Sequence, residues 1–192
     1  MIRKLHISVL SMMLAIIVSG IFSLGYVKSL IGENLDSETQ YVMPKINLTN
    51  YDLNTVNITM SRGQCFGTCP VYYLEIDGNG KITYKGFFYV NVTGERTTQI
   101  SPQKVKELIT AFDNADYFNL RDKYDEIRFT DLSTVETSIS INGIYKSVYD
   151  YYGTVEVPEL NKLRNLEKMI DKVTNSSQWV GNNYLTSKFH LK

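Results

Sequence analysis

The sequence predicts an α+β fold, in which an antiparallel sheet of about four to six strands carries two helices on one face. The first observation is a pair of strand-like runs, residues 71–90 and 134–152, that each fold back at a turn rich in Gly, Asn or Asp. The second is that each run is followed by a segment with apolar residues at helical spacing, residues 102–118 and 158–173. Hairpin pairing is antiparallel, and two one-sided helices both need an apolar surface to cover, so the pattern favours a two-layer domain.

The first half of this domain holds the stronger hairpin. In "VYYLEI", Tyr72, Leu74 and Ile76 share one strand face and are the better core candidates. Shorter strands are expected before and after the hairpin, in "NITMS" and "ERTTQI". Ser101 and Pro102 then provide an N-cap and a first-turn proline for the first helix. Its apolar stripe consists of Val105, Leu108, Ile109, Phe112 and Ala115.

The second half repeats this order of elements. Alternation in "TVETSISI" puts Val135, Thr137, Ile139 and Ile141 on one face, and Asn142-Gly143 supplies the turn. Pro158 opens the second helix. The stripe of that helix consists of Leu160, Leu163, Leu166, Met169, Ile170 and Val173. The succession hairpin, helix, hairpin, helix suggests a degenerate internal duplication, although the two halves share little sequence.

The N-terminus predicts export from the cytoplasm. Residues 5–27 are apolar for about the length that crosses a bilayer, with Arg3 and Lys4 before them and acidic residues after them. Residues 1–31 are therefore expected to be a transmembrane anchor or a cleaved signal peptide, and both readings stay open. Residues 32–54 read as a polar linker, 55–180 as the globular domain and 181–192 as a tail. The expected location is the cell membrane with the domain outside the cytoplasm, or secretion if the segment is cleaved.

Charge and sequons agree with an exported chain. The formal net charge is zero, and residues 1–31 contain three basic and no acidic residues, so the remainder is mildly acidic and has no basic cluster for nucleic acid. Nucleic acid is thus not an expected partner. The four sequons that would make the chain a glycoprotein begin at Asn47, Asn57, Asn91 and Asn175.

The only two cysteines, Cys65 and Cys69, stand in "QCFGTCPVY" and allow several readings. Outside the cytoplasm, a structural disulfide is the favoured one, with Gly67 supplying the bend and Pro70 a stiff exit. The segment also looks like the Cys-x-x-x-Cys-Pro motif of membrane-anchored copper chaperones of cytochrome oxidase assembly, and soft thiolates select Cu(I). Those proteins are thioredoxin-like and need a distant histidine, for which His190 in the tail is the candidate. Thiol exchange and structural zinc are weaker, because the second cysteine leads into a strand and further ligands are missing.

The order of these motifs resembles a widespread family of exported and lipid-anchored prokaryotic proteins, a domain of unknown function with a Cys-x-Gly-x-Cys-Pro-x-Tyr segment before a hairpin. The resemblance covers about residues 58–180. It implies no activity. The positions it highlights are Cys65, Gly67, Cys69, Pro70, Tyr72, Gly80, Tyr84, Gly86, Tyr124, Asp131 and Thr134.

Signals for catalysis are weak. The body contains no histidine, which argues against Ser-His-Asp or Cys-His chemistry. The carboxylates Asp122, Asp125, Glu126 and Asp131 lack the spacing of a calcium loop and are expected to form a solvated acidic loop. Neither a cofactor nor a metal is expected, and the assignment as an enzyme stays open with a non-catalytic role favoured.

The better functional surface is a tyrosine face. Tyr145, Tyr149 and Tyr151 alternate onto one side of the last strand, and tyrosine is enriched at interfaces. The alternative is that helices and tail bury both sides. The sequence thus favours a membrane-anchored, extracytoplasmic interaction or ligand-binding domain stapled by Cys65 and Cys69, with an unidentified protein or ligand as partner. The alternative function is an extracytoplasmic copper or thiol-redox protein that uses the same two cysteines.

Overall fold

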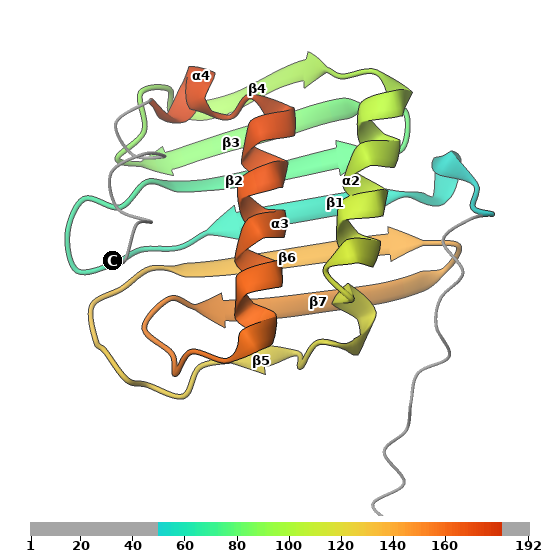
Figure 1. The fold of residues 1–192 in the computed structure, drawn as a ribbon. Coiled ribbons are helices and arrows are strands. Elements are labelled where there is room, and N and C mark those ends of the chain that lie inside the picture. Colours follow the sequence, from blue (N-terminus) through green and yellow to red (C-terminus); the bar gives the residue numbers. More distant parts are fainter. Residues whose placement is uncertain (1–49, 182–192) are drawn as a thin grey trace, which may run out of the picture. The chain divides into compact units, whose positions relative to one another are not determined.

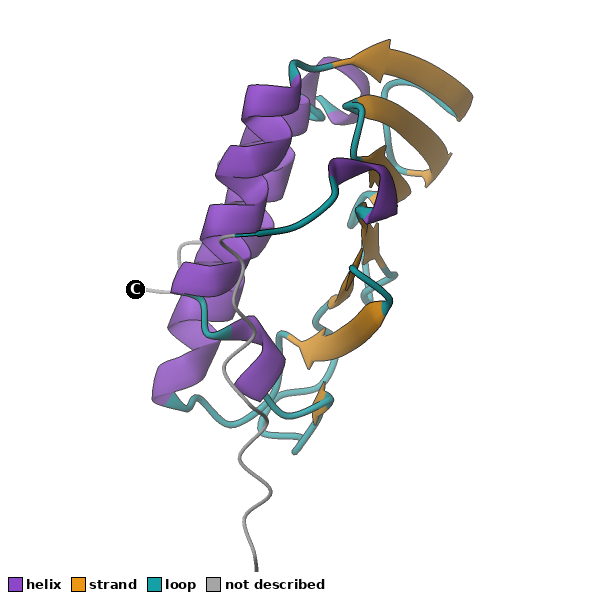
Figure 2. Ribbon diagram, turned by 90° about the vertical axis from the view of Figure 1, so that its right-hand side faces the viewer, coloured by secondary structure: helices purple, strands orange, loops and turns teal. Residues whose placement is uncertain are grey.

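The computed structural model of the chain describes residues 50–181. These residues form one seven-stranded sheet with helices on one face (Figures 1 and 2). The strands lie side by side in the order β4-β3-β2-β1-β6-β7-β5. Their bounds are β1 Asn57–Arg62, β2 Val71–Asp77, β3 Lys81–Phe88, β4 Gly94–Gln99, β5 Lys123–Tyr124, β6 Thr134–Ile141 and β7 Ile144–Tyr151.

The sheet is assembled around β1, which pairs antiparallel with β2 on one side and with β6 on the other. Strict alternation of apolar residues determines which face is buried, because successive side chains of a strand point to opposite faces. The predicted core positions of β2, Tyr72, Leu74 and Ile76, are all buried. The β6–β7 turn uses Asn142 and Gly143, both with positive φ, which is the conformation that a tight two-residue hairpin requires.

Two helices, α2 Pro102–Asn114 and α3 Pro158–Thr174, run across the strands on the same face of the sheet (Figures 1 and 2). As predicted, the Ser101 side chain accepts a hydrogen bond from the Lys104 N–H at the start of α2. The core lies between the two layers. Its largest fully buried side chains include Tyr72, Tyr84, Tyr117, Tyr124 and Phe112. The short helices η1 Leu53–Thr55, η2 Tyr117–Asn119 and α4 Ser177–Val180 complete the described part.

The predicted antiparallel sheet of four to six strands is wrong, because the sheet is mixed and has seven strands. The seventh strand, β5, pairs parallel to β7 through Lys123 and Tyr124. A strand of two residues has no periodicity to detect, and its parallel pairing depends on the chain returning to the sheet after α2. The duplication is not borne out either: the first half contributes four strands and the second three, with different pairings.

The predicted N-terminal membrane segment, residues 1–31, lies outside the described residues, as do most of the predicted linker and all of the tail beyond residue 181. In residues 50–181, no helix combines the length and apolar character needed to cross a membrane. This part of the predicted fold therefore has no support.

Candidate functional site

Charged and hydroxyl side chains form a cluster buried between the sheet and α3. It lies beside the Cys loop, which we define as residues 63–70 between β1 and β2. On the sheet, the register aligns Tyr72, Arg62, Val135 and Asp150 in one row across β2, β1, β6 and β7. Three members of this row are polar and face the helices, so they need partners from the helix layer.

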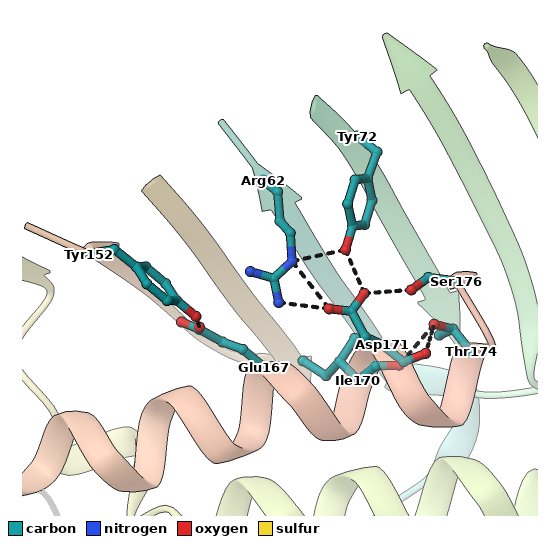
Figure 3. Close-up of polar contacts among 8 residues, drawn as sticks. All are labelled: Arg62, Tyr72, Tyr152, Glu167, Ile170, Asp171, Thr174 and Ser176. Carbon is teal, nitrogen blue, oxygen red and sulfur yellow. Dashed lines mark hydrogen bonds and ion pairs between the residues drawn. The ribbon is translucent and has the colours of Figure 1, made fainter. Parts of the chain in front are cut away.

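The partners come from α3, where Arg164, Glu167 and Asp171 follow at spacings of three and four residues. This spacing puts all three on one side of the helix. Figure 3 shows Glu167 and Asp171 pointing from α3 toward the strands. Both carboxylates are buried, which is rare for unpaired charges.

Asp171 binds groups from both strands that border the Cys loop (Figure 3). Its Oδ2 accepts hydrogen bonds from Arg62 Nη2 at 2.6 Å and Nε at 3.1 Å. Its Oδ1 accepts from the Tyr72 hydroxyl at 2.6 Å and from the Ser176 hydroxyl at 2.7 Å. Burial alone would lower the pKa of Arg62, but the negative charge of Asp171 raises it well above its usual value. Burial raises the pKa of Tyr72 well above its ordinary value, so this hydroxyl stays protonated and can donate.

Glu167 occupies the middle of the cluster. The Tyr152 hydroxyl donates a hydrogen bond to Glu167 Oε2 at 2.6 Å (Figure 3). Arg164 Nε forms an ion pair with Asp150 Oδ2 at 2.8 Å. Among the described residues, Glu167 Oε1 has no hydrogen-bond partner. Burial, followed by the charge of Asp150, raises the pKa of Glu167 to about 8, although Arg62 acts in the opposite direction. A protonated Glu167 leaves two arginines and two aspartates, which is a balanced set of charges.

This cluster is an internal clamp rather than a reaction centre. The side chains that would have to meet a substrate are nearly inaccessible, with Arg62 4%, Asp171 5% and Glu167 0% exposed. Removing one partner of a buried ion pair is costly, because the other charge is left uncompensated in the interior. The cluster therefore ties α3 to β1, β2 and β7.

The Cys loop leaves the sheet directly next to this clamp. Cys65 and Cys69 form a disulfide with a Cα–Cα distance of 5.7 Å, which confirms the predicted staple. Gly67 has φ 144°, as the predicted bend requires, and Pro70 is buried at the start of β2. The N–H groups of Gly63 and Phe66 donate to the carbonyls of Thr134 (2.8 Å) and Asp131 (3.1 Å). The loop is thus held by a covalent bond and by two hydrogen bonds to its neighbour.

Most of the exposed apolar surface gathers at the same end of the domain. We define the loop end as the β1–β2, β3–β4 and β5–β6 loops together with the segment between β7 and α3 and the adjoining end of β3 (Figure 1, left side). Of nine large exposed apolar side chains in the described part, seven lie here: Phe66, Phe87, Phe88, Tyr89, Ile127, Phe129 and Val155. Single exposed apolar residues are ordinary, but seven at one end make the loop end the candidate site of the described part.

The predicted tyrosine face is the helix-free face of the sheet, but its members have different surroundings. Tyr145 is 66% exposed, whereas Tyr149 and Tyr151 are half-buried. The Tyr151 hydroxyl donates to the Phe129 carbonyl at 2.8 Å, which joins it to the loop end. Lys123 Nζ lies 5.6 Å from the centre of the Tyr149 ring. Tyr151 therefore borders the loop end, and Tyr145 lies near the opposite end of β7, so the three do not form one compact site.

The acidic loop forms surface ion pairs. Asp122 pairs with Lys146, Lys123 Nζ lies 2.6 Å from Asp125 Oδ2, and Arg121 Nη1 lies 2.7 Å from Glu126 Oε1. In residues 50–181, no three His, Cys, Asp or Glu side chains are grouped as a metal site would need. His190, the candidate ligand of the copper reading, lies outside the described residues, and the disulfide occupies both sulfurs.

The remaining motif positions have structural surroundings. Tyr124 is buried in β5, and its hydroxyl accepts from the Arg121 N–H at 3.3 Å. Asp131 has φ 73° and offers its carbonyl to the Cys loop.

The sequons differ in their surroundings. Asn57 lies in β1 and donates to Glu75 Oε1 at 2.8 Å, which gives glycosylation there no support. Asn91 and Asn175 are exposed, and Asn47 lies outside the described residues.

Sequence reasoning missed most of the clamp, namely Arg62, Asp150, Arg164, Glu167 and Asp171. A signal was present for two of them. Arg62 continues the buried alternation of Ile58 and Met60, and Asp171 lies next to Ile170 on the apolar stripe of α3. A charged residue at a buried position of a strand and another at a buried position of a helix indicate an ion pair between the two elements. Which charges meet depends on where the helix crosses the strand.

The comparisons with known proteins give a domain of unknown function, as the sequence predicted. No curated protein matches the chain. The model of the family described as "Domain of unknown function (DUF6438)" matches residues 56–174, from the start of β1 to the end of α3. With more than half of its length matched, the chain belongs to the DUF6438 family.

Proposed function

We propose that this chain provides a non-catalytic, extracytoplasmic binding domain whose contact surface is the loop end. One observation carries the proposal: Phe66 is 88% exposed at the tip of a loop that is closed by the Cys65–Cys69 disulfide. An apolar ring held out in water by a rigid loop is the arrangement of an interface anchor.

The physical advantage of this arrangement is preorganisation. Ordering an interface loop opposes binding, because each immobilised side chain and each backbone residue loses conformational freedom. In the Cys loop that freedom is already restricted by the disulfide and by the hydrogen bonds of Gly63 and Phe66. Burial of Phe66 against a partner would then contribute most of its free energy to affinity.

The surroundings of Phe66 indicate the shape of the surface. Phe88 is the last residue of β3 and is paired with Val71, which directly follows the Cys loop and Pro70. On the other side, Asp131 links the Cys loop to the segment that carries Phe129. The Cys loop thus adjoins two segments that carry exposed aromatic rings, Phe88 at the end of β3 and Phe129 in the β5–β6 loop. An exposed aromatic anchor with further apolar side chains at the same end of the domain fits a partner protein that presents an apolar pocket.

The disulfide also supports the compartment. Disulfides persist outside the cytoplasm and are rare inside it. Two half-buried cysteines in a loop of five residues would be readily reduced in a thiol-rich compartment. The partner is therefore expected among extracytoplasmic proteins. The predicted tyrosine face contributes through Tyr151, which adjoins Phe129, whereas Tyr145 lies near the opposite end of β7 and outside the loop end.

Site-specific photo-crosslinking tests the proposal. A benzophenone analogue of phenylalanine replaces Phe66 in the full chain, expressed in its native host. The same analogue at Asn79, an exposed position in the β2–β3 turn at the opposite end of the sheet, is the matched control. A discrete adduct at position 66 that is absent at position 79 is expected, and competition by unlabelled wild-type chain should suppress it. A Phe66→Ala competitor should fold normally but fail to compete. The same adducts at both positions, or none at position 66, would contradict the proposed surface.

A further inference from the structure

Two residues of the clamp lie in the strands that enter and leave the Cys loop. Arg62 is the last residue of β1 and Tyr72 the second residue of β2, so the Cys loop spans the gap between them. Both side chains bind the same carboxylate, that of Asp171 (Figure 3). The strands that enter and leave the Cys loop are therefore fixed to one point on α3.

A second connection leads from the same carboxylate to the β3–β4 loop. The Ser176 hydroxyl donates to Asp171 Oδ1 at 2.7 Å and, together with the bond from the Ser176 N–H to the Asp171 carbonyl, holds the turn between α3 and α4. At the other end of α4, the carbonyl of Trp179 accepts from the Val92 N–H at 2.9 Å. The Trp179 ring stacks on Tyr84 of β3 with 4.8 Å between ring centres. The β3–β4 loop, which follows Phe88, is thus also tied to α3 through Ser176.

We propose that Asp171 is the positioning residue of the loop end: its carboxylate sets where the Cys loop and the β3–β4 loop lie relative to each other. This inference deepens the proposed function and rests on it for its biological meaning. The inference rests on how the hydrogen bonds are divided between the two carboxylate oxygens of Asp171. Oδ2 serves Arg62, whereas Oδ1 serves Tyr72 and Ser176, so one side chain links three separate elements. A simple ion pair for stability would need Arg62 alone.

Amide hydrogen exchange tests the inference without any partner, because the bonded amides at each end are known. The N–H groups of Gly63, Phe66 and Val92 report on the loop end, and those of Gly80 and Ile100 report on the opposite end. In Asp171→Asn, the amide oxygen can still accept from Tyr72 and Ser176, but the amide nitrogen faces Arg62 and cannot accept. We expect exchange at the loop end to accelerate by about tenfold or more, with less than about a twofold change at the opposite end.

Ser176→Ala separates the two connections and keeps the ion pair intact. It should accelerate the exchange of Val92 and leave Gly63 and Phe66 within about twofold of the wild type. Leu163→Ala is the matched control, since this buried α3 residue is not among the groups that bind Asp171. It should change the amides of both ends by similar factors, as a general loss of stability does.

Three results would overturn the inference: equal acceleration at both ends in Asp171→Asn, no acceleration in that variant, or equal effects of Ser176→Ala on Phe66 and Val92. The outcome is independent of the crosslinking at position 66. A local exchange response without an adduct would leave Asp171 as a positioning residue and refute the binding surface. An adduct at position 66 with equal acceleration at both ends would support the binding surface and refute Asp171 as its positioning residue.

Discussion

Replacing Glu167 with Gln should change how the stability of the chain depends on pH. Glu167 is fully buried, and its pKa is raised from 4.5 to about 8 by burial first and then by the charge of Asp150. The folded chain therefore holds this proton more tightly than the unfolded chain does. The stabilisation of the fold that comes from this proton is fully present below the unfolded pKa of 4.5. It is lost as pH rises through the folded pKa near 8.

The magnitude follows from the size of the shift. One pKa unit corresponds to about 1.4 kcal/mol, so the free energy of unfolding should fall by about 4 to 5 kcal/mol between pH 4.5 and 9 because of Glu167 alone. Gln keeps an oxygen that can accept the Tyr152 hydrogen bond, but it cannot ionise. Its second polar atom takes the place of Oε1, which has no partner among the described residues, so a constant cost of about 1 to 3 kcal/mol is expected at every pH.

Urea unfolding of the full chain at a series of pH values, with the disulfide intact, measures this effect. Titrating groups that do not interact with Glu167 are common to both proteins, so their contributions cancel in the difference between Glu167→Gln and wild type. Between pH 4.5 and 9, the free energy of unfolding of Glu167→Gln should rise by several kcal/mol relative to that of the wild type. Glu95→Gln, at an exposed position on β4, is the control and should give a nearly constant difference. A difference between Glu167→Gln and wild type that stays constant across the range would refute the reasoning.

Further predictions concern the loop and the turns. Replacing Cys65 and Cys69 together with Ser should lower the free energy of unfolding by about 2 kcal/mol, the loop-closure value for so short a ring, as measured by urea unfolding. Gly86→Ala should prevent stable folding or lower the melting temperature sharply, because a Cβ at this position would lie 2.2 Å from the Val92 carbonyl oxygen. Asn175 ends α3 with φ 51°, so Asn175→Ala should cost about 1 kcal/mol by thermal unfolding, and Asn175→Gly should be nearly neutral.

The sheet shows what sequence patterns can and cannot determine. Alternation in β2 and β6 predicted which residues are buried, because a half-buried strand repeats every two residues. Lys123 and Tyr124 of β5 gave no such signal, and only the position of η2 and β7 brings them to the sheet edge. The disulfide was predictable because its partners are four residues apart and have no competitors. The clamp was not, since Arg62 and Asp171 are 109 residues apart.

Four positions of the family resemblance, Gly67, Tyr72, Tyr84 and Gly86, lie together at the loop end. Gly67 bends the Cys loop, and Tyr72 anchors the exit of that loop to Asp171. Gly86 lies opposite Tyr72 on β3, where the Tyr84 hydroxyl donates to the Val92 carbonyl and fills the space that a side chain would need.

Each of these residues acts on the shape of a surface, and none presents a reactive group to solvent. If the loop end is a binding surface, the residues that place the loops should determine its shape. The residues at the tips, such as Phe66, should then determine which partner each member of the family binds. Exchanging the tip residues of the Cys loop between two family members while keeping Tyr72 and Asp171 should therefore transfer crosslinking to the other member's partner. If crosslinking to the other partner appeared only when the clamp residues were exchanged as well, the clamp itself would determine the choice of partner.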